Sequence, residues 1–270
     1  MLDRFAKTLA KAPKHPLTFA GQFNVLKPFG KHAAAGAIAI LKDPTKRRQF
    51  RNWAGDAIAD IGDKSVMAEL KAIADDFLYE DDDQESAAFA LAALGDTSET
   101  DKRIATLEDE RRRTGSLSVA LRIAHVHYRA RQYVKAVKMY RNILASFEKG
   151  LAAKKDEFEP EQLAQYRSWQ AGWYYSLACN QSLEGKPAEA MKSLDECLRH
   201  GRDGRHLEML MRDGDLMKVR HHATFAKWYE KARAAVKTKS PAKKPDAPGK
   251  AAPPAERPAG EKKKAGSVGG

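Results

Sequence analysis

Two cysteines are the side chains of this 270-residue chain best suited to nucleophilic, redox or metal chemistry. Cys179 and Cys197 fall on two successive predicted helices, at positions that usually hold small or apolar residues. Free cysteines commonly pack as small hydrophobic side chains, and they stay reduced in a reducing compartment. We therefore expect two core thiols, since the neighbouring sequence offers neither of them a metal-binding or redox partner.

The histidines do not form a predicted metal site. His125 and His127 are two positions apart, so on a helix their side chains point to different sides. His221 and His222 are adjacent and have the same limitation. These residues are expected to be surface or packing histidines.

One acidic motif, Asp213-Gly214-Asp215, is compatible with a metal or phosphate site. It lacks the further oxygen ligands and the distal Glu of a calcium loop, so Asp215 is expected to cap a helix instead. The chain contains no Walker-type loop and no Gly-x-Ser-x-Gly, His-Glu-x-x-His or Cys-x-x-Cys motif. The sequence therefore predicts a non-enzyme without cofactor or metal.

The elements that carry these residues are predicted to be helices. No proline lies between Pro44 and Pro160, and no apolar–polar alternation at strand period is found. Residues 236–270 hold six of the twelve prolines and no aromatic residue, so this tail is predicted to be disordered. No segment reaches the roughly 20 apolar residues of a membrane-spanning helix. Without a secretory signal at the start, a cytoplasmic location is expected.

Charge is segregated along the chain, whose formal net charge is +12. Residues 53–113 carry seventeen acidic and seven basic side chains, and the segments on either side are basic. The simplest interpretation is that water solvates these charges. The alternative is that they bind nucleic acid or an anionic surface, because clustered Lys and Arg attract phosphate. The basic side chains cluster at Lys46, Arg47, Arg48 and Arg51 beside Trp53, and again at Lys262, Lys263 and Lys264.

An acidic run precedes one predicted helix. It comprises residues 80–83 and Glu85. Carboxylates favour the positive end of a helix dipole, and this is the interpretation we prefer. A docking face for a basic partner, or for the chain's own basic tail, is the alternative.

A repeated phrase indicates helical hairpins in the first half of the chain. Residues 53–63 read WAGDAIADIGD, residues 87–96 read AAFALAALGD, and a weaker copy spans residues 23–30. Glycine supplies the left-handed residue after one helix, and Asp63 or Asp96 caps the next. The phrase resembles the short HEAT-like repeats of the lyase type; three unrelated Ala-rich hairpins are the alternative. Relatives with this phrase handle bilin chromophores, so the resemblance also implies a lyase-type enzyme as a further alternative.

The second half contains a different phrase, which resembles the tetratricopeptide (TPR) repeat. Its small residues stand where the two helices of one repeat cross, and larger ones fill the gaps beside them. Ala136 and Ala190 are 54 positions apart where the family has 34, so an insertion between Gly150 and Gln170 is expected to form a connector and a helix starting near Pro160. The small residues are Ala124, Ala136, Ala178 and Ala190.

A closing segment follows the second repeat. Asp213-Gly214-Asp215-Leu216, Val219-Arg220 and a later stretch from Phe225 to Tyr229 resemble the segment after the last TPR repeat in many bacterial proteins. Such a segment covers the open apolar end of a helical array. The whole chain thus resembles bacterial proteins that combine HEAT-like and TPR repeats. It is predicted to be an all-α solenoid with a basic segment at 1–16, HEAT-like repeats at 17–113, TPR-like repeats at 114–235 and the tail at 236–270.

The first helices of the TPR-like repeats are expected to line a binding groove. A basic and aromatic groove suits an acidic or carboxylate-terminated peptide, although His125 and Cys179 replace the asparagines of the chaperone-binding carboxylate clamp. The predicted function is a scaffold or adaptor that binds a protein or peptide partner. The predicted groove residues are Arg122, His125, Tyr128, Arg129, Tyr175, Cys179 and Ser182.

Overall fold

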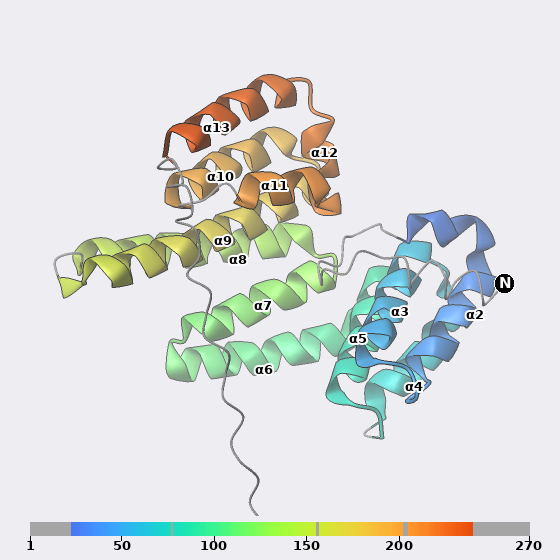
Figure 1. The fold of residues 1–270 in the computed structure, drawn as a ribbon. Helices are drawn as coiled ribbons and strands as arrows, with labels where there is room; N and C mark the ends of the chain where they lie inside the picture. The colour runs from blue at the N-terminus through green and yellow to red at the C-terminus, as the bar shows by residue number, and fades with distance from the viewer. Residues whose placement is uncertain (1–22, 77, 155–156, 202–204, 240–270) are drawn as a thin grey trace, which may run out of the picture.

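The computed structural model describes residues 23–76, 78–154, 157–201 and 205–239, and every regular element in these ranges is a helix (Figure 1). The predicted all-α fold class is confirmed. The first half contains η1 (Asn24–Phe29), α2 (Gly30–Leu41), α3 (Arg48–Ile61), η2 (Lys64–Val66), α4 (Met67–Asp75), α5 (Asp81–Leu94) and α6 (Ser98–Thr114). The second half contains α7 (Leu117–Arg129), α8 (Tyr133–Ala153), α9 (Pro160–Glu184), α10 (Pro187–His200), α11 (Arg205–Arg212), η4 (Gly214–Leu216), α12 (Met217–Arg220) and α13 (Phe225–Lys239).

The two better copies of the first phrase end their helices as predicted. Gly62 follows α3 with φ 77° and Gly95 follows α5 with φ 109°, both in the left-handed region. Asp63 and Asp96 then accept hydrogen bonds from the backbone two residues further on, and these bonds lower the pKa of both carboxyl groups. The weaker copy differs: the 3₁₀ helix η1, which contains Pro28, runs directly into α2 at Gly30 without a turn.

A close helix crossing joins α3 to α5. A Cβ atom added at Gly55 would lie 3.0 Å from both Cβ and the backbone oxygen of Ser86. Ala54, Ala57, Ala87 and Ala90 are fully or almost fully buried beside this crossing. Small side chains at these positions therefore let the two helices approach closely.

The second half contains the predicted helix pairs, α7 with α8 and α9 with α10. The four small residues predicted at the crossings, Ala124, Ala136, Ala178 and Ala190, are all fully buried. The inserted residues extend both middle helices: α8 has 21 residues and α9 has 25, against 13 in α7. Pro160 is the first residue of α9, as predicted, after a capping box between Glu159 and Gln162. The α8–α9 hairpin consequently projects beyond the other helices (Figure 1).

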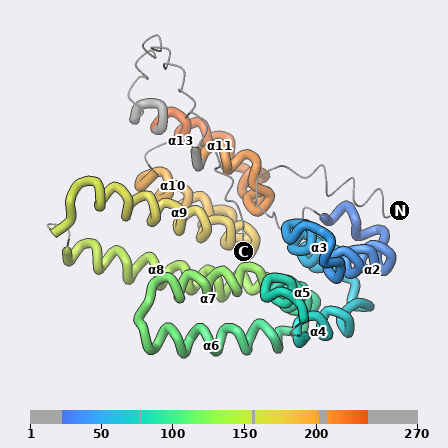
Figure 2. Tube along the Cα trace, turned by 60° about the horizontal axis from the view of Figure 1, so that its bottom comes forward, coloured from blue at the N-terminus to red at the C-terminus, as the bar shows by residue number. Residues whose placement is uncertain are grey.

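The apolar core is continuous across the predicted boundary between residues 113 and 114. Phe89 of α5, Leu107 of α6 and Ile123 of α7 belong to one cluster of buried side chains. Further clusters join α7, α8 and α9, and then α9, α10 and the closing segment. Figures 1 and 2 show α6 to α10 lying in successive layers, with α2 to α5 grouped at one end.

The closing segment packs against α9 and α10. Leu210, Leu216 and Val219 are almost fully buried in the same cluster as Ala178 and Leu194. The predicted cap is corrected: Asp215 lies inside η4, and Asp213, two residues earlier, caps η4 by accepting from the backbone N–H of Asp215 at 2.9 Å.

The predicted end regions are only partly described. The boundary proposed at residue 236 falls inside α13, which continues to Lys239. Residues 1–22 and 240–270, with the predicted basic segment and most of the predicted tail, lie outside the described residues. Among the described helices, none is both long enough and apolar enough to cross a bilayer.

Candidate functional site

Three of the predicted groove residues are buried in the protein. Tyr175, Cys179 and Ser182 are 7%, 6% and 0% exposed, so their expected surface position is corrected. α9 is covered on that side by the closing segment, to which Tyr175 donates a hydrogen bond at Asp213 Oδ2 (2.8 Å). Direct contact between these side chains and a partner would require the closing segment to move.

A buried carboxylate cluster surrounds Cys179. One candidate ligand atom each from Cys179, Asp213 and Asp215 lies within 4.8 Å of the others, so the fold places beside this cysteine two metal-ligand types that its neighbouring sequence does not offer. The sequence held no direct signal for this, because 34 positions separate Cys179 from Asp213. Protein donors already engage both carboxylates: Tyr175 donates to Asp213, and the Tyr128 hydroxyl donates to Asp215 at 2.6 Å. The hydrogen bonds of this cluster accordingly connect α7 and α9 to the closing segment.

The two free cysteines are buried, as predicted. Burial raises the pKa of the Cys179 thiol well above its usual range, and neighbouring Asp213 and Asp215 add to the effect. Burial also raises the pKa of Cys197 to about 12. Since the thiolate is the reactive form, both side chains are poor nucleophiles at neutral pH.

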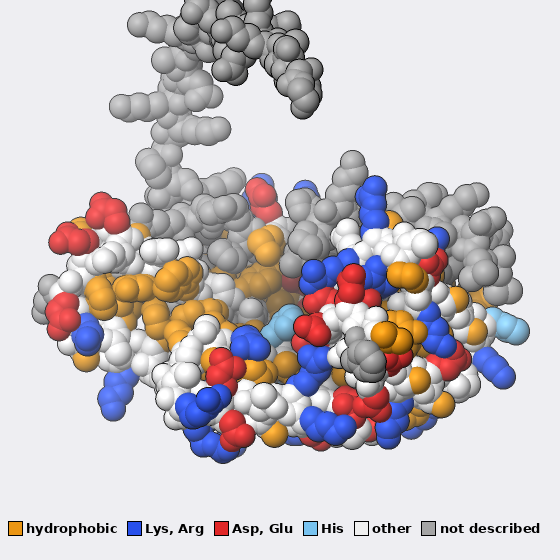
Figure 3. Space-filling view, turned by 90° about the horizontal axis from the view of Figure 1, so that it is seen from below, with side chains coloured by type: hydrophobic (Ala, Val, Ile, Leu, Met, Phe, Trp, Pro, Cys, Tyr) orange, Lys and Arg blue, Asp and Glu red, His pale blue; other side chains and the backbone are white. Residues whose placement is uncertain are grey.

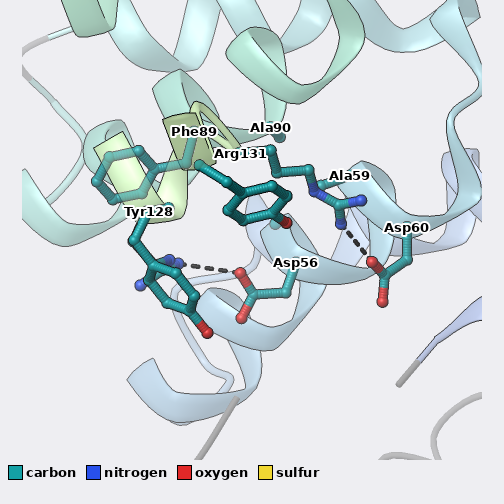
Figure 4. Close-up of a pocket in the computed structure, with 10 residues that line it drawn as sticks. Asp56, Ala59, Asp60, Phe89, Ala90, Tyr128 and Arg131 are labelled. Atoms are coloured by element: carbon teal, nitrogen blue, oxygen red, sulfur yellow. Dashed lines mark hydrogen bonds and ion pairs between the residues drawn. The ribbon is translucent and has the colours of Figure 1, made fainter. Parts of the chain in front are cut away.

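Tyr128 and Arg129, two further predicted groove residues, line a small pocket where the two halves of the chain meet (Figure 4). This junction pocket has a volume of about 30 Å³, room for only about one or two water molecules. Arg129 pairs with Asp56 of α3 at 3.1 Å, and its guanidinium lies 4.8 Å from the centre of the Phe89 ring. Tyr128 also lines the pocket, and both side chains are thus engaged within the protein.

The turn between α7 and α8 adds a second ion pair to the junction pocket. Arg131 has a φ of 58°, the one described non-glycine residue in the left-handed region, and its guanidinium pairs with Asp60 of α3. Asp60 also accepts a hydrogen bond from the backbone N–H of Phe23 at 3.0 Å. Burial raises the pKa of Asp56, and the nearby Arg129 opposes this shift. Charged side chains on α3 therefore hold the α7–α8 turn in place.

The remaining predicted groove residues, Arg122 and His125, are exposed. They line a separate depression of about 660 Å³ together with Glu85 and Arg103. Arg122 pairs with Glu110 of α6 at 3.2 Å. Surrounding protein and the charge of Arg129 lower the pKa of His125. The seven predicted residues consequently divide among three places and do not form one groove.

The basic cluster on α3 faces the acidic run at the start of α5. Arg51 is 5% exposed; its Nε donates to both carboxylate oxygens of Asp83 at 2.9 Å, and Nη2 donates to Glu80 at 2.5 Å. Arg48 pairs with Asp82. Two arginines of the predicted basic cluster thus bind three carboxylates of the acidic run.

A groove that the sequence did not reveal lies beside the projecting part of α8. This α8 groove has a volume of about 740 Å³ and is bounded by the α6–α7 turn, α8 and the start of α9. Figure 3 shows hydrophobic side chains gathered on the side of the molecule where the hairpin projects. Trp169, at its edge, is 47% exposed. The apolar lining residues are Leu117, Ala120, Met139, Ile143, Phe147, Leu151, Phe158, Tyr166 and Trp169.

A buried histidine beside the α7–α8 turn predicts a pH-dependent loss of stability. His127 is 7% exposed and hydrogen-bonds Gln132 through Nδ1 at 2.8 Å, and burial lowers its pKa. Below its ordinary pKa of 6.5 the unfolded chain takes up a proton that the folded chain resists, so stability is present above pH 6.5 and falls as the pH falls. The slope is at most about 1.4 kcal/mol per pH unit for one histidine.

The test compares urea unfolding of the unmodified chain and the His127→Met variant at pH 7 and pH 5. We expect the variant to lose less free energy of unfolding over this interval. The exposed His221→Met substitution is the control and should leave the difference unchanged. Equal losses in the unmodified chain and in His127→Met would contradict the prediction.

Comparison of the chain with protein-family models, with curated proteins and with solved structures finds no match.

Proposed function

We propose that this chain is a non-catalytic helical scaffold that binds a protein partner in the α8 groove. The observation that carries the proposal is an apolar surface that the described helices leave uncovered. Trp169 is 47% exposed and Phe147, Leu151, Phe158 and Tyr166 are half-buried. Contiguous exposed apolar surface with a charged rim is typical of interaction sites.

The α8 groove takes the place of the groove expected from the TPR-like spacing. Tyr175, Cys179 and Ser182 are unsuited to direct partner contact because they are buried, and Arg129 because Asp56 neutralises it. Arg122 and His125 line a depression that also contains the charged side chains of Glu85 and Arg103. This depression has less apolar surface than the α8 groove. Apolar area removed from water is the larger source of binding free energy.

The proposal predicts that partner binding depends on the groove and not on exposed apolar surface in general. The variant Leu151→Glu/Trp169→Glu places two charges in the groove at half-buried and exposed positions. Val134→Glu is the matched control, because Val134 is 65% exposed on the same helix α8 but does not line the groove.

Affinity capture with quantitative mass spectrometry compares the three proteins after circular dichroism has shown equal helicity. We expect Val134→Glu to recover the same proteins as the unmodified chain. The groove variant should recover at least about tenfold less of each, as for loss of a central apolar anchor. The same proteins recovered in equal amounts with the groove variant would refute the α8 groove as the binding surface.

A further inference from the structure

We infer that the occupant of the α8 groove is an amphipathic helix of a partner protein whose polar face is acidic. This inference rests on the proposed function and names the chemistry of its partner. Three features of the groove carry it: a linear apolar stripe, a basic rim, and aromatic rings that pack edge to face.

The apolar stripe runs along one face of α8. Met139, Ile143, Phe147 and Leu151 follow one another at intervals of four residues, so they form a single ridge on the helix surface. At 1.5 Å per residue the ridge is about 18 Å long, and its last part, from Phe147 to Leu151, spans about one helical turn. Ridges of this kind are the surface against which helices pack, and an extended strand would leave its backbone donors and acceptors unpaired here.

The groove exists because the neighbouring helix is too short to cover the stripe. α7 has 13 residues and begins at Leu117, whereas α8 has 21. Ile143, next to α7, is 3% exposed, but Phe147 and Leu151 lie beyond the covered part and are half-buried. A helix of the partner placed beyond the start of α7 would cover the rest of the ridge, as α7 covers its beginning.

The charged side chains that line the groove are all basic: Arg111, Arg112 and Lys154. Each pairs with an acidic residue on or near its own helix, namely Glu108, Asp109 and Glu157. The Arg111 pair is partly buried, whereas the Arg112 and Lys154 pairs are exposed. Exposed pairs three positions apart contribute little stability and exchange readily. Carboxylates on an incoming helix can therefore replace them without leaving a buried charge unpaired.

The arrangement of the aromatic rings favours a helix over single-stranded nucleic acid. Base stacking requires open ring faces. Here Phe147 meets Tyr166 and Trp173 edge to face at 78° and 86°, and Phe158 meets Tyr166 at 75°. The rings thus form a packed apolar wall, suited to Leu or Phe side chains at helical spacing.

A second copy of this chain is a poorer occupant. Two copies joined through the same groove would bring Arg111, Arg112 and Lys154 of each protomer towards those of the other. Like charges at such an interface oppose association. The basic rim consequently selects an acidic partner and disfavours self-association.

The test titrates the full chain with a panel of conformationally constrained helical peptides of about 14 residues, a length that extends past the open part of the ridge at both ends. All carry Leu, Phe or Trp on one face; one half of the panel has Glu on the other face, and the matched half has Lys. Binding is measured by calorimetry at low and high salt. We expect the best Glu peptides to bind about tenfold tighter than their Lys counterparts, with a difference that shrinks in salt.

Variants separate this inference from the proposed function. Arg112→Glu/Lys154→Glu should reverse the preference between Glu and Lys peptides, and Leu151→Glu/Trp169→Glu should abolish binding of both. Equal or tighter binding of the Lys peptides, displacement of the Glu peptides by a single-stranded oligonucleotide, or self-association that is lost in Leu151→Glu/Trp169→Glu would overturn the inference. If affinity capture still shows groove-dependent recovery of a partner in that case, the proposed function stands and the acidic helix alone is refuted.

Discussion

Replacing Arg51 by alanine is expected to lower the free energy of unfolding by about 3–5 kcal/mol, the usual cost of breaking a buried ion pair by removing one partner. The side chains of Arg51 and Asp83 are only 6% and 5% exposed, and Nε lies 2.9 Å from both carboxylate oxygens. Nη1 also donates to the backbone oxygen of Lys46 at 2.7 Å. Without the guanidinium, the Asp83 carboxylate would remain buried with no cation beside it.

Two further variants make this expectation specific to the buried pair. Arg48→Ala removes a neighbouring arginine of α3 that is 64% exposed and pairs with Asp82, and it should cost no more than about 1 kcal/mol. Arg51→Met/Asp83→Leu removes both buried charges and should recover most of the lost stability. Urea unfolding measures all three. An Arg51→Ala cost no larger than that of Arg48→Ala would contradict the assignment of a structural ion pair.

Replacing Asp213 by alanine is expected to cost about 3–5 kcal/mol, because it leaves several buried donors without an acceptor at about 1–3 kcal/mol each. Asp213 is 4% exposed and accepts from the Tyr175 hydroxyl, the backbone N–H of Asp215 and, at 3.7 Å, the Cys179 thiol. The same substitution removes the cap of η4, so the closing segment should detach from α9.

Asp213→Asn is the control, because its amide oxygen keeps one of the two acceptor positions, Oδ1 for the Asp215 N–H or Oδ2 for Tyr175 and Cys179, and removes the negative charge beside Asp215. We expect the asparagine variant to retain part of the stability that the alanine variant loses. Both variants relieve repulsion between the two carboxylates, so their difference excludes that repulsion and includes the hydrogen bonds to the acceptor that asparagine keeps. Alanine and asparagine variants of equal stability in urea would show that these bonds do not hold the closing segment.

Local features of the helices were predictable from the sequence. The glycines at 62 and 95 end helices, and Pro160 begins α9. Asp63 caps η2, and Asp96 accepts from the backbone N–H of Ser98 at the start of α6. Each of these features depends on backbone conformation and hydrogen bonds within about one helical turn. Short-range order of this kind is readable from residue types and spacing.

The predicted site was less successful, because burial of a helix face depends on what packs against it. The TPR-like spacing places the positions of Tyr175 and Cys179 on a face that lines a groove in a regular array. Here the closing segment lies against that face, and its Asp213 engages both side chains across a separation of more than 30 positions. No local pattern in α9 indicates that contact.

The sequence by itself determined that this protein is all-helical, where several of its helices begin and end, and which small residues lie at their crossings. Only the tertiary structure decided that Arg51 of the basic cluster forms a buried ion pair with Asp83, and that the open apolar surface lies along α8 beyond the start of α7. Helix formation is governed by neighbours along the chain, so it can be read from the sequence. Pairing of charges and exposure of a face are governed by neighbours in space, and those are set by the lengths and crossings of helices distant in sequence.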